Sequence, residues 1–332
     1  MASFLLKNAH LPNGEQTEIL IENGLIARIG PSVGETSGPI IDACGQYVVP
    51  GYYNMHTHSA MTLVRGYRDD MELFNWLKSI RAVEAHLDED AIYWGTRLAC
   101  LEMIKSGTVF FSDMYFLLDS SAQAIADSGI KALLTSCFLD GGKEHKKLQD
   151  RRDCERDFMI SQKWPGSVRF GVSVHAPYTV CEENILWAAA FARERGLPIT
   201  IHVSETESEN KEFSATHGVS PVRHLEKLKF WGDDVMVAHG LHLSDEDIKI
   251  LGEHHVTVAH CINSNLKLAS GYRFRYQELR DAGVNVCLGT DGAASSNNLD
   301  MRESLKTTAL LQKAWRNDPA TMHLDDLMSV IS

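Results

Sequence analysis

Residues 50–58 read PGYYNMHTH, an extended apolar segment that ends in two histidines one residue apart. On a β-strand, side chains at positions i and i+2 point to the same face, so His56 and His58 share one side and Thr57 lies on the other. The chain contains 15 histidines. A single pair is therefore as compatible with a solvated strand edge as with the wall of a functional site. The residues at the ends of the other strands distinguish the two.

Seven further apolar segments follow this one and alternate with amphipathic segments typical of helices. We expect a first strand within 47–58 and later strands at 107–115, 131–139, 168–177, 198–205, 235–240, 256–261 and 285–292. Eight such units fit a (β/α)8 barrel in both number and length. A doubly wound open sheet is the alternative, but no G-x-G-x-x-G motif follows an early strand. The sequence therefore predicts an α/β fold of the TIM-barrel type.

The first 50 residues have a different pattern, with short alternating apolar and polar stretches separated by turn residues such as Pro-Asn-Gly and Glu-Asn-Gly. This pattern is typical of short strands joined by tight turns. We expect a small β-sandwich-type domain over residues 1–50 and a barrel domain over residues 51–332.

Composition limits the classes of partner. The chain has 332 residues, 44% hydrophobic and 23% charged, which is typical of a globular protein. Acidic residues outnumber basic ones by 44 to 32, and the net charge of −12 argues against nucleic acid or an anionic membrane as partner. No apolar run is long enough to span a bilayer, and the N-terminus lacks the apolar core of a signal peptide. Seven cysteines without a C-x-x-C pair favour reduced thiols in a cytoplasmic protein.

Ionisable residues follow six of the expected strands, and in a barrel such positions meet at one mouth. They are His56 and His58, His175, His202 and Glu205, His239, His260, and Asp291. One histidine at a strand end is more commonly a hydrogen-bonded structural residue. Burying this many ionisable groups in one pocket is costly unless they share a metal ion or a substrate.

Imidazole and carboxylate groups are the usual ligands of zinc and similar divalent ions. His56, His58, His202 and Asp291 would supply three nitrogens and one carboxylate, with a position left for water. A bound ion lowers the pKa of its water from 15.7 toward about 7. Glu205 and His239 remain for proton transfer. Zinc, iron and manganese all accept such ligands.

Several motifs together resemble the amidohydrolase superfamily. These are the His-x-His pair, HVSE (202–205), VAHG (237–240), VAHC (258–261) with NSNLKL (263–268), and GTDG (289–292). More narrowly, HTHSAMTLVRGYRDDMELFNWL (56–77), HAPYT (175–179) and GTDGAASSNNLDM (289–301) resemble the S-adenosylhomocysteine and 5′-methylthioadenosine deaminase branch, which is close to chlorohydrolases and guanine deaminases. The resemblance covers almost the whole chain.

The resemblance implies hydrolytic deamination of an adenosine derivative, with hydroxide attacking C6 and ammonia leaving. It assigns His56, His58, His202 and Asp291 as ligands of one divalent ion, most commonly zinc. Glu205 would move a proton to the ring nitrogen, and His239 and Asp291 would orient the attacking water and take up its proton. Glu84 would bind ribose hydroxyls, His175 would contact the substrate, and Trp76 would line the pocket. A purine nucleoside is the implied partner, and we also expect a homo-oligomer.

The chain departs from this branch in two places. Ser136 stands near the end of the third barrel strand, where adenosine-analogue deaminases tend to have an arginine. We expect Arg151 or Arg152, in the charged stretch 140–157, as the substitute. Relatives also continue beyond LDDLMSVIS (324–332), so we expect the C-terminal half of the small domain to be missing and its strands to have exposed edges.

Two alternatives stay open on the sequence, and two others require residues that the chain lacks. The first is hydrolysis of a C–N or C–Cl bond in guanine, pterin or triazine substrates. A binuclear amidohydrolase needs a carboxylated lysine after the fourth strand, but GVSVHAP (171–177) has none, so one ion is expected. A cytidine-type deaminase needs P-C-x-x-C in addition to an H-x-E motif such as the HLE of residues 224–226, and this class is excluded because the chain has no P-C-x-x-C. The last alternative is a non-catalytic metal-binding barrel.

Overall fold

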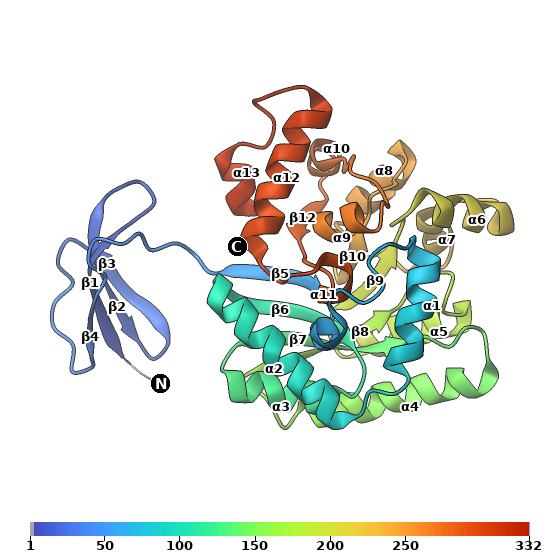
Figure 1. Ribbon diagram of the computed structural model, residues 1–332, viewed down its shortest axis with the longest axis horizontal. Coiled ribbons are helices and arrows are strands. Elements are labelled where there is room, and N and C mark those ends of the chain that lie inside the picture. Colours follow the sequence, from blue (N-terminus) through green and yellow to red (C-terminus); the bar gives the residue numbers. More distant parts are fainter. Residues whose placement is uncertain (1–2, 332) are drawn as a thin grey trace. The chain divides into compact units, whose positions relative to one another are not determined.

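Eight strands pair in sequence order in the computed structural model, each parallel to the next, and they form a nearly closed barrel (Figure 1). This confirms the predicted fold. The structure describes residues 3–331, which divide between Gly51 and Tyr52 into two compact units. The barrel strands are β5 (Tyr52–Thr57), β6 (Thr108–Tyr115), β7 (Lys131–Phe138), β8 (Val168–Val174), β9 (Ile199–Val203), β10 (Val235–His239), β11 (Thr257–His260) and β12 (Asn285–Leu288).

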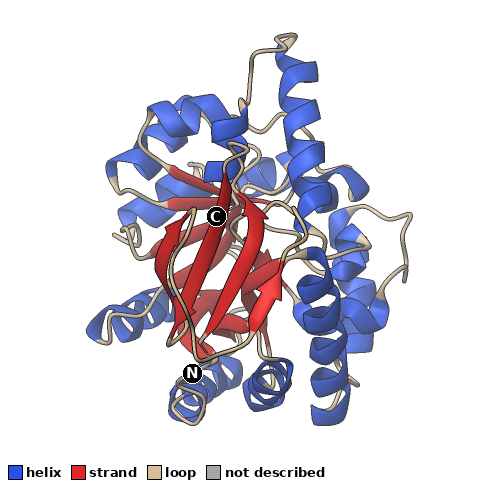
Figure 2. Cartoon of the chain, turned by 90° about the vertical axis from the view of Figure 1, so that its left-hand side faces the viewer, coloured by secondary structure: helices blue, strands red, loops and turns tan. Residues whose placement is uncertain are grey.

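Helices connect the strands and surround the barrel (Figure 2). Their boundaries follow the expected signals: the helix 89–106 begins after Asp88, whose carboxylate accepts from the N–H of Ala91 at 2.9 Å, and ends at Gly107 with φ of 94°. The helices are η1 (Ser59–Val64, a 3-10 helix), α1 (Leu73–Glu84), α2 (Glu89–Ser106), α3 (Leu118–Ser128), α4 (Glu144–Ser161), α5 (Glu182–Glu194), α6 (Glu207–His217), α7 (Pro221–Lys227), α8 (Asp245–Glu253), α9 (Ile262–Lys267), α10 (Tyr276–Asp281), α11 (Ala293–Ser296), α12 (Met301–Arg316) and α13 (Leu324–Ser329).

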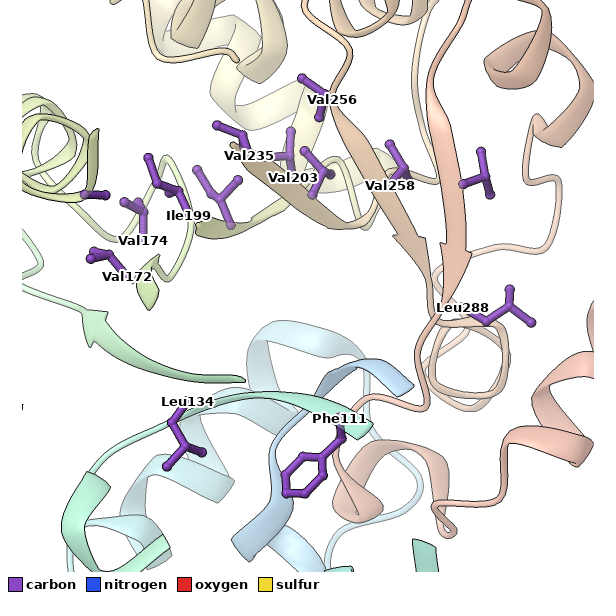
Figure 3. Packing of buried hydrophobic residues seen from close by; sticks show 14 of the residues in the cluster. Phe111, Leu134, Val172, Val174, Ile199, Val203, Val235, Val256, Val258 and Leu288 are labelled. Carbon is purple, nitrogen blue, oxygen red and sulfur yellow. The ribbon is translucent and has the colours of Figure 1, made fainter. Parts of the chain in front are cut away.

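Alternation along the strands separates the core from the barrel interior. In β9, Ile199, Ile201 and Val203 belong to the main hydrophobic cluster, and His202 alternates with them on the other face. Figure 3 shows Ile199 and Val203 together with residues of neighbouring strands in this cluster. All five residues of β9 are buried, because helices cover one face and the barrel interior covers the other. The strand therefore holds His202 rigidly.

The first and last strands meet at a seam held by backbone and side-chain hydrogen bonds. The N–H of Asp291 donates to the carbonyl of His56 at 2.9 Å. Asn54 donates from Nδ2 to Thr290 Oγ1 at 2.7 Å and accepts from the N–H of Thr290 at 3.0 Å. The carbonyls of Val330 and Ile331, which follow α13, accept from the N–H groups of Leu288 and Tyr53, at 3.0 and 2.8 Å.

Helix α1 forms one wall of the barrel mouth. It begins after Glu72, whose carboxylate accepts from the N–H groups of Phe74 and Asn75. Leu73, Trp76 and Ile80, spaced three and four residues apart, pack with η1 and α2 in a second hydrophobic cluster. The charged stretch 140–157 lies mostly in the regular helix α4.

The smaller unit contains one four-stranded sheet in the order β3-β2-β1-β4, with Leu5, Leu20 and Val33 as its buried cluster. Its strands are β1 (Phe4–His10), β2 (Gln16–Glu22), β3 (Leu25–Gly30) and β4 (Ile40–Asp42). The edge strands β3 and β4 expose apolar side chains, with Leu25 73% and Ile40 61% exposed. Residues 3–51 contain no second sheet, so the sandwich partner of this sheet stays a prediction.

All seven cysteines are free thiols. Across residues 3–331, the helices are too short or too polar for any of them to cross a membrane.

Gly289 provides a test of the seam. A Cβ atom at this position would lie 2.8 Å from the N, O and Cβ atoms of His56, so Gly289→Ala is expected to push β12 away from β5. We expect the free energy of unfolding, measured in urea, to fall by about 1–3 kcal/mol. Gly166→Ala is the control, because no atom lies within 4 Å of its Cβ position, and a change within about 0.5 kcal/mol is expected. Equal effects of the two substitutions would contradict the role of the seam.

Candidate active site

A cavity of about 330 Å³ opens at the C-terminal ends of the barrel strands. The predicted site residues that line it are Trp76, Glu84, His58, His175, His202, Glu205, His239 and Asp291. His56 is buried behind them, with its ring centroid 5.0 Å from that of His58 and 4.8 Å from that of His202. The structure therefore brings together residues from five strand ends and from α1.

Four of these side chains point donor atoms at one common position. Nε2 of His202 lies 3.1 Å from Nε2 of His56, and Oδ1 of Asp291 lies 3.4 Å from Nε2 of His56 and 3.2 Å from Nε2 of His58. Ligands at zinc–nitrogen distances around a tetrahedral ion stand about 3.3 Å apart. The three histidines form a group able to hold a metal ion, and the residues present fit one divalent ion.

The other ring nitrogens are fixed by the barrel wall. Nδ1 of His58 donates to the carbonyl of Met114 at 2.6 Å, and Nδ1 of His202 donates to the carbonyl of His175 at 2.6 Å. A proton held on Nδ1 leaves the lone pair on Nε2, which faces the common position. Both rings are thus set in the tautomer that a metal ligand requires.

Asp291 is the most constrained of the donors. Its backbone is in the left-handed region at φ of 62°, and its Oδ2 accepts from the hydroxyls of Ser264 and Ser295, both at 2.7 Å. Burial raises the pKa of Asp291, but hydrogen bonds and charge from His56 and His58 outweigh it and hold the pKa well below its usual range. The carboxylate is therefore ionised and has Oδ1 free to face the histidines.

The charge balance of these donors favours a cation. Burial opposes a proton on His58, yet hydrogen bonding to Asp291 and the charge of Asp291 raise the pKa of His58 to about 9. The donor set therefore attracts positive charge even against the cost of burial, and a divalent ion would supply that charge.

Glu205 and His239 lie beside the donors, with Nε2 of His239 3.7 Å from Oε2 of Glu205. Burial, followed by the charges of Asp291 and Glu209, raises the pKa of Glu205 well above its usual value, which favours the protonated form of its carboxyl group. Burial lowers the pKa of His239 to about 3, so this ring is neutral. The amide nitrogen of Asn265 donates to its Nδ1 at 3.1 Å, which leaves the ring proton on Nε2, toward the cavity.

Two residues of α1 face the cavity with unsatisfied hydrogen-bonding capacity. Tyr115 donates its hydroxyl to Oε1 of Glu84 at 2.7 Å and leaves Oε2 open. Trp76 is 4% exposed and its Nε1 has no hydrogen-bond partner among the described residues. A buried donor on a cavity wall is satisfied when a ligand accepts from it. His175 lines the cavity as well, with Nδ1 2.8 Å from Thr179 Oγ1.

The structure does not place Arg151 or Arg152 where either could substitute for the missing arginine. Ser136 donates to Oδ2 of Asp157 at 2.8 Å, away from the cavity lining. Arg151 pairs with Glu183 at 2.6 Å and donates to Asn184, because its helix packs beside α5. Arg152 is exposed and does not line the cavity either. The cations that do line it are Arg81 of α1 and Lys146 of α4.

His260 does not take part in the cavity lining. Its ring stacks on Phe274 with centroids 3.9 Å apart, and neither ring nitrogen has a hydrogen-bond partner among the described residues. This strand-end histidine is therefore a packing residue.

Sequence reasoning missed several residues that hold the site. Asp113 accepts from the N–H and the hydroxyl of Ser59, at 2.6 and 2.7 Å, next to His58. Its position after the apolar run TVFF, near the end of β6, is a signal that could have found it. Ser264 and Ser295 stand within motifs that the sequence already singled out, and Glu209 lies four residues after Glu205.

Comparison with known proteins places this geometry in a family. Residues 47–332 match the amidohydrolase family. The chain is 45% identical over 285 residues to a 5′-deoxyadenosine deaminase of Methanoregula boonei, covering 85% of this chain and 64% of that protein. It is 42% identical over 325 residues to a 5-methylthioadenosine/S-adenosylhomocysteine deaminase of Thermococcus sibiricus, covering 96% of this chain and 76% of that protein.

Solved structures agree with the fold. A zinc-bound adenosine deaminase from Xanthomonas campestris superimposes with a TM-score of 0.90 at 30% identity, covering 98% of this chain and 77% of that chain. A guanine deaminase from Clostridium acetobutylicum has a TM-score of 0.84 at 20% identity, which supports the fold alone.

The donor geometry predicts one divalent ion per chain, measured by elemental analysis of the purified protein. His202→Ala is expected to weaken metal affinity by about 100-fold or more, since even loss of a group behind a ligand costs 10–100-fold. His254→Ala is the control, because His254 pairs with Glu226 outside the cavity and should leave the metal content unchanged. Two ions per chain, or unchanged affinity in His202→Ala, would refute the four-donor site.

Proposed function

Because the chain belongs to the amidohydrolase family, we propose that it is a metal-dependent hydrolytic deaminase of adenosine derivatives altered at the 5′ position. One observation carries the proposal: three histidine nitrogens and a carboxylate oxygen converge beside Glu205, whose pKa is raised by burial. The names of the M. boonei and T. sibiricus relatives support the substrate class. This chain spans 64% and 76% of those proteins, so the activity is proposed for the chain as it stands.

We propose zinc as the ion, held by His56, His58, His202 and Asp291, in keeping with the zinc bound by the X. campestris protein. A divalent ion held there would supply the acidity that makes water a nucleophile near neutral pH.

The residues around these donors account for the movement of protons. Glu205, protonated before the reaction, donates to the ring nitrogen next to C6 and makes that carbon more electrophilic. His239 donates from Nε2 to the oxygen that bonds to C6 and stabilises the charge that develops on it. Asp291 takes up the proton of the attacking water and passes it to the leaving amine. The amino group leaves as ammonia, and the second proton of the water passes to Glu205 as C6 becomes a carbonyl. One water is thereby consumed and Glu205 regains the proton that it gave to the ring nitrogen.

The rest of the cavity supports a nucleoside in preference to a free base. Glu84 has one carboxylate oxygen held by Tyr115 and the other open, an arrangement suited to a ribose hydroxyl donor. The indole N–H of Trp76 is buried without a partner and suits an acceptor on the substrate. His175 lies on the same cavity wall as His202, with ring centroids 5.0 Å apart.

The binuclear alternative has less support. His56, His239 and Cys261 form a second group of metal-ligating atoms, but His56 is shared with the first group. Burial raises the pKa of the Cys261 thiol well above its usual value, which opposes the thiolate that a metal ligand requires. A homo-oligomer in the cytoplasm remains a prediction for this chain.

The function is tested by ammonia release from metal-loaded protein given 5′-methylthioadenosine, S-adenosylhomocysteine or 5′-deoxyadenosine. Glu205→Gln is expected to keep its metal and lose about 100-fold or more in kcat, because general acid catalysis contributes 10²–10⁴-fold. Glu207→Gln is the matched control, since Glu207 lies two residues on and its carboxylate is exposed beside Lys211. Metal-loaded protein that releases ammonia from no purine would exclude a deaminase of this class and favour a non-catalytic metal-binding barrel.

Glu84 separates a nucleoside deaminase from an enzyme acting on a free heterocycle. Glu84→Ala is expected to raise KM for the adenosine derivatives by about tenfold, the cost of one hydrogen bond to a charged group. Activity toward adenine, guanine or a chlorotriazine should not change through this substitution. The matched control is Glu89→Ala on the next helix, where the side chain is exposed. A larger loss for free bases than for nucleosides would favour a guanine-, pterin- or triazine-type enzyme.

A further inference from the structure

Glu209 is a buried carboxylate that the reaction does not use directly. It lies in the first turn of α6 and is 3% exposed. Its Oε1 accepts from the N–H of Ser204 at 2.9 Å, and its Oε2 accepts from the N–H of Glu205 at 2.8 Å. Both oxygens of one carboxylate therefore hold two successive N–H groups, and the second of these belongs to Glu205.

The helix does not need Glu209 as its cap. Thr206 is the N-cap of α6 and accepts from the N–H of Glu209 at 3.0 Å. In a capping box, the third residue of the helix reaches back to the N–H of the cap residue. Glu209 bonds the backbone of Thr206 as well and reaches further, to the two residues before the cap, so its carboxylate also acts on the turn that follows β9.

That turn is strained and is held from both sides. Ser204 has φ of 55°, in the left-handed region that costs a non-glycine residue free energy. Its carbonyl accepts from the N–H groups of Leu241 and His242, at 3.0 and 2.9 Å, on the segment that follows His239. Glu209 thus fixes the donors of the turn, and the segment after β10 fixes its acceptor. Together they set the backbone of Glu205 relative to His239.

We propose that Glu209 is a positioning residue that holds the turn 204–205 so that the carboxyl of Glu205 reaches the ring nitrogen of the substrate. The inference rests on the proposed deaminase function. Proton transfer requires donor and acceptor within about 2.6–3.2 Å, and a misplacement of about 1 Å can cost 10²-fold in rate. The strained turn relaxes when its two N–H groups lose their acceptors, and Glu205 moves with it.

The experiment compares Glu209→Gln and Glu209→Asp with the metal-loaded wild-type protein, using 5′-methylthioadenosine as substrate. A glutamine offers one acceptor oxygen and turns an N–H donor toward the turn. We expect Glu209→Gln to lower kcat by about 10- to 100-fold and to leave KM within about twofold of the wild-type value. The variant should still bind one metal ion per chain. Glu209→Asp keeps the carboxyl group with both acceptor oxygens on a shorter stem, and it should recover part of that loss.

Asp247→Asn is the matched control. Asp247 is 1% exposed and its carboxylate accepts from the N–H of Ser244 at the start of α8, outside the cavity lining. We expect this variant to lower the melting temperature and to keep the wild-type kcat. The proposal is overturned when Glu209→Gln keeps kcat within about twofold of wild type. It is also overturned when the fall in kcat of Glu209→Gln is no larger than its fall in metal content, or no larger than the fall in kcat of Asp247→Asn. Glu209→Asp is read by the same criteria where the glutamine variant does not fold.

A separate measurement distinguishes this proposal from the proposed function. Amide hydrogen exchange at Ser204 and Glu205 is compared in the wild type and Glu209→Gln, with no substrate present. Faster exchange at both amides in the variant supports the role of Glu209 in holding the turn 204–205, even where the wild type releases no ammonia. Unchanged exchange overturns that role.

Discussion

The hydrogen bond from the N–H of Asp291 to the carbonyl of His56, 2.9 Å long, joins the end of the barrel to its beginning. It links residues separated by most of the chain, so it forms only when all eight strands are in register. The same contact brings the carboxylate of Asp291 against the rings of His56 and His58. Closure of the fold and assembly of the donor set are therefore one event, and the site depends on the cooperative folding of the whole barrel.

The sequence predicts the features that are local to each strand end. An apolar run followed by a histidine or an aspartate can be read within one strand, and the barrel topology then places these ends together. For that reason His56, His58, His202 and Asp291 could be predicted before any contact between them was known. Helix α4 is harder to predict from the sequence, because only Cys154, Asp157 and Ser161 of its 18 residues are buried and its charged sequence resembles a loop.

The supporting contacts could not be read in this way, since each depends on a partner far along the chain. Ser264 and Ser295 bind Asp291 from two different short helices, α9 and α11. Ser136 stands where the resemblance implied an arginine, and only the structure shows it bonded to Asp157 of α4. The replacement by Arg151 looked reasonable in sequence, but Glu183 and Asn184 of α5 compete for that guanidinium in the folded chain.

Three non-glycine residues in the left-handed region lie where the site is built: Ser204, His239 and Asp291, with φ of 55°, 71° and 62°. Each follows or ends a barrel strand, and each such residue costs about 1–3 kcal/mol. The turn at Ser204 is held by Glu209, the ring of His239 by Asn265, and the carboxylate of Asp291 by two serine hydroxyls. Folding free energy offsets this strain before a substrate arrives, so the donors need little reorganisation during the reaction. The buried polar contacts around the mouth therefore serve to keep the reactive groups in place.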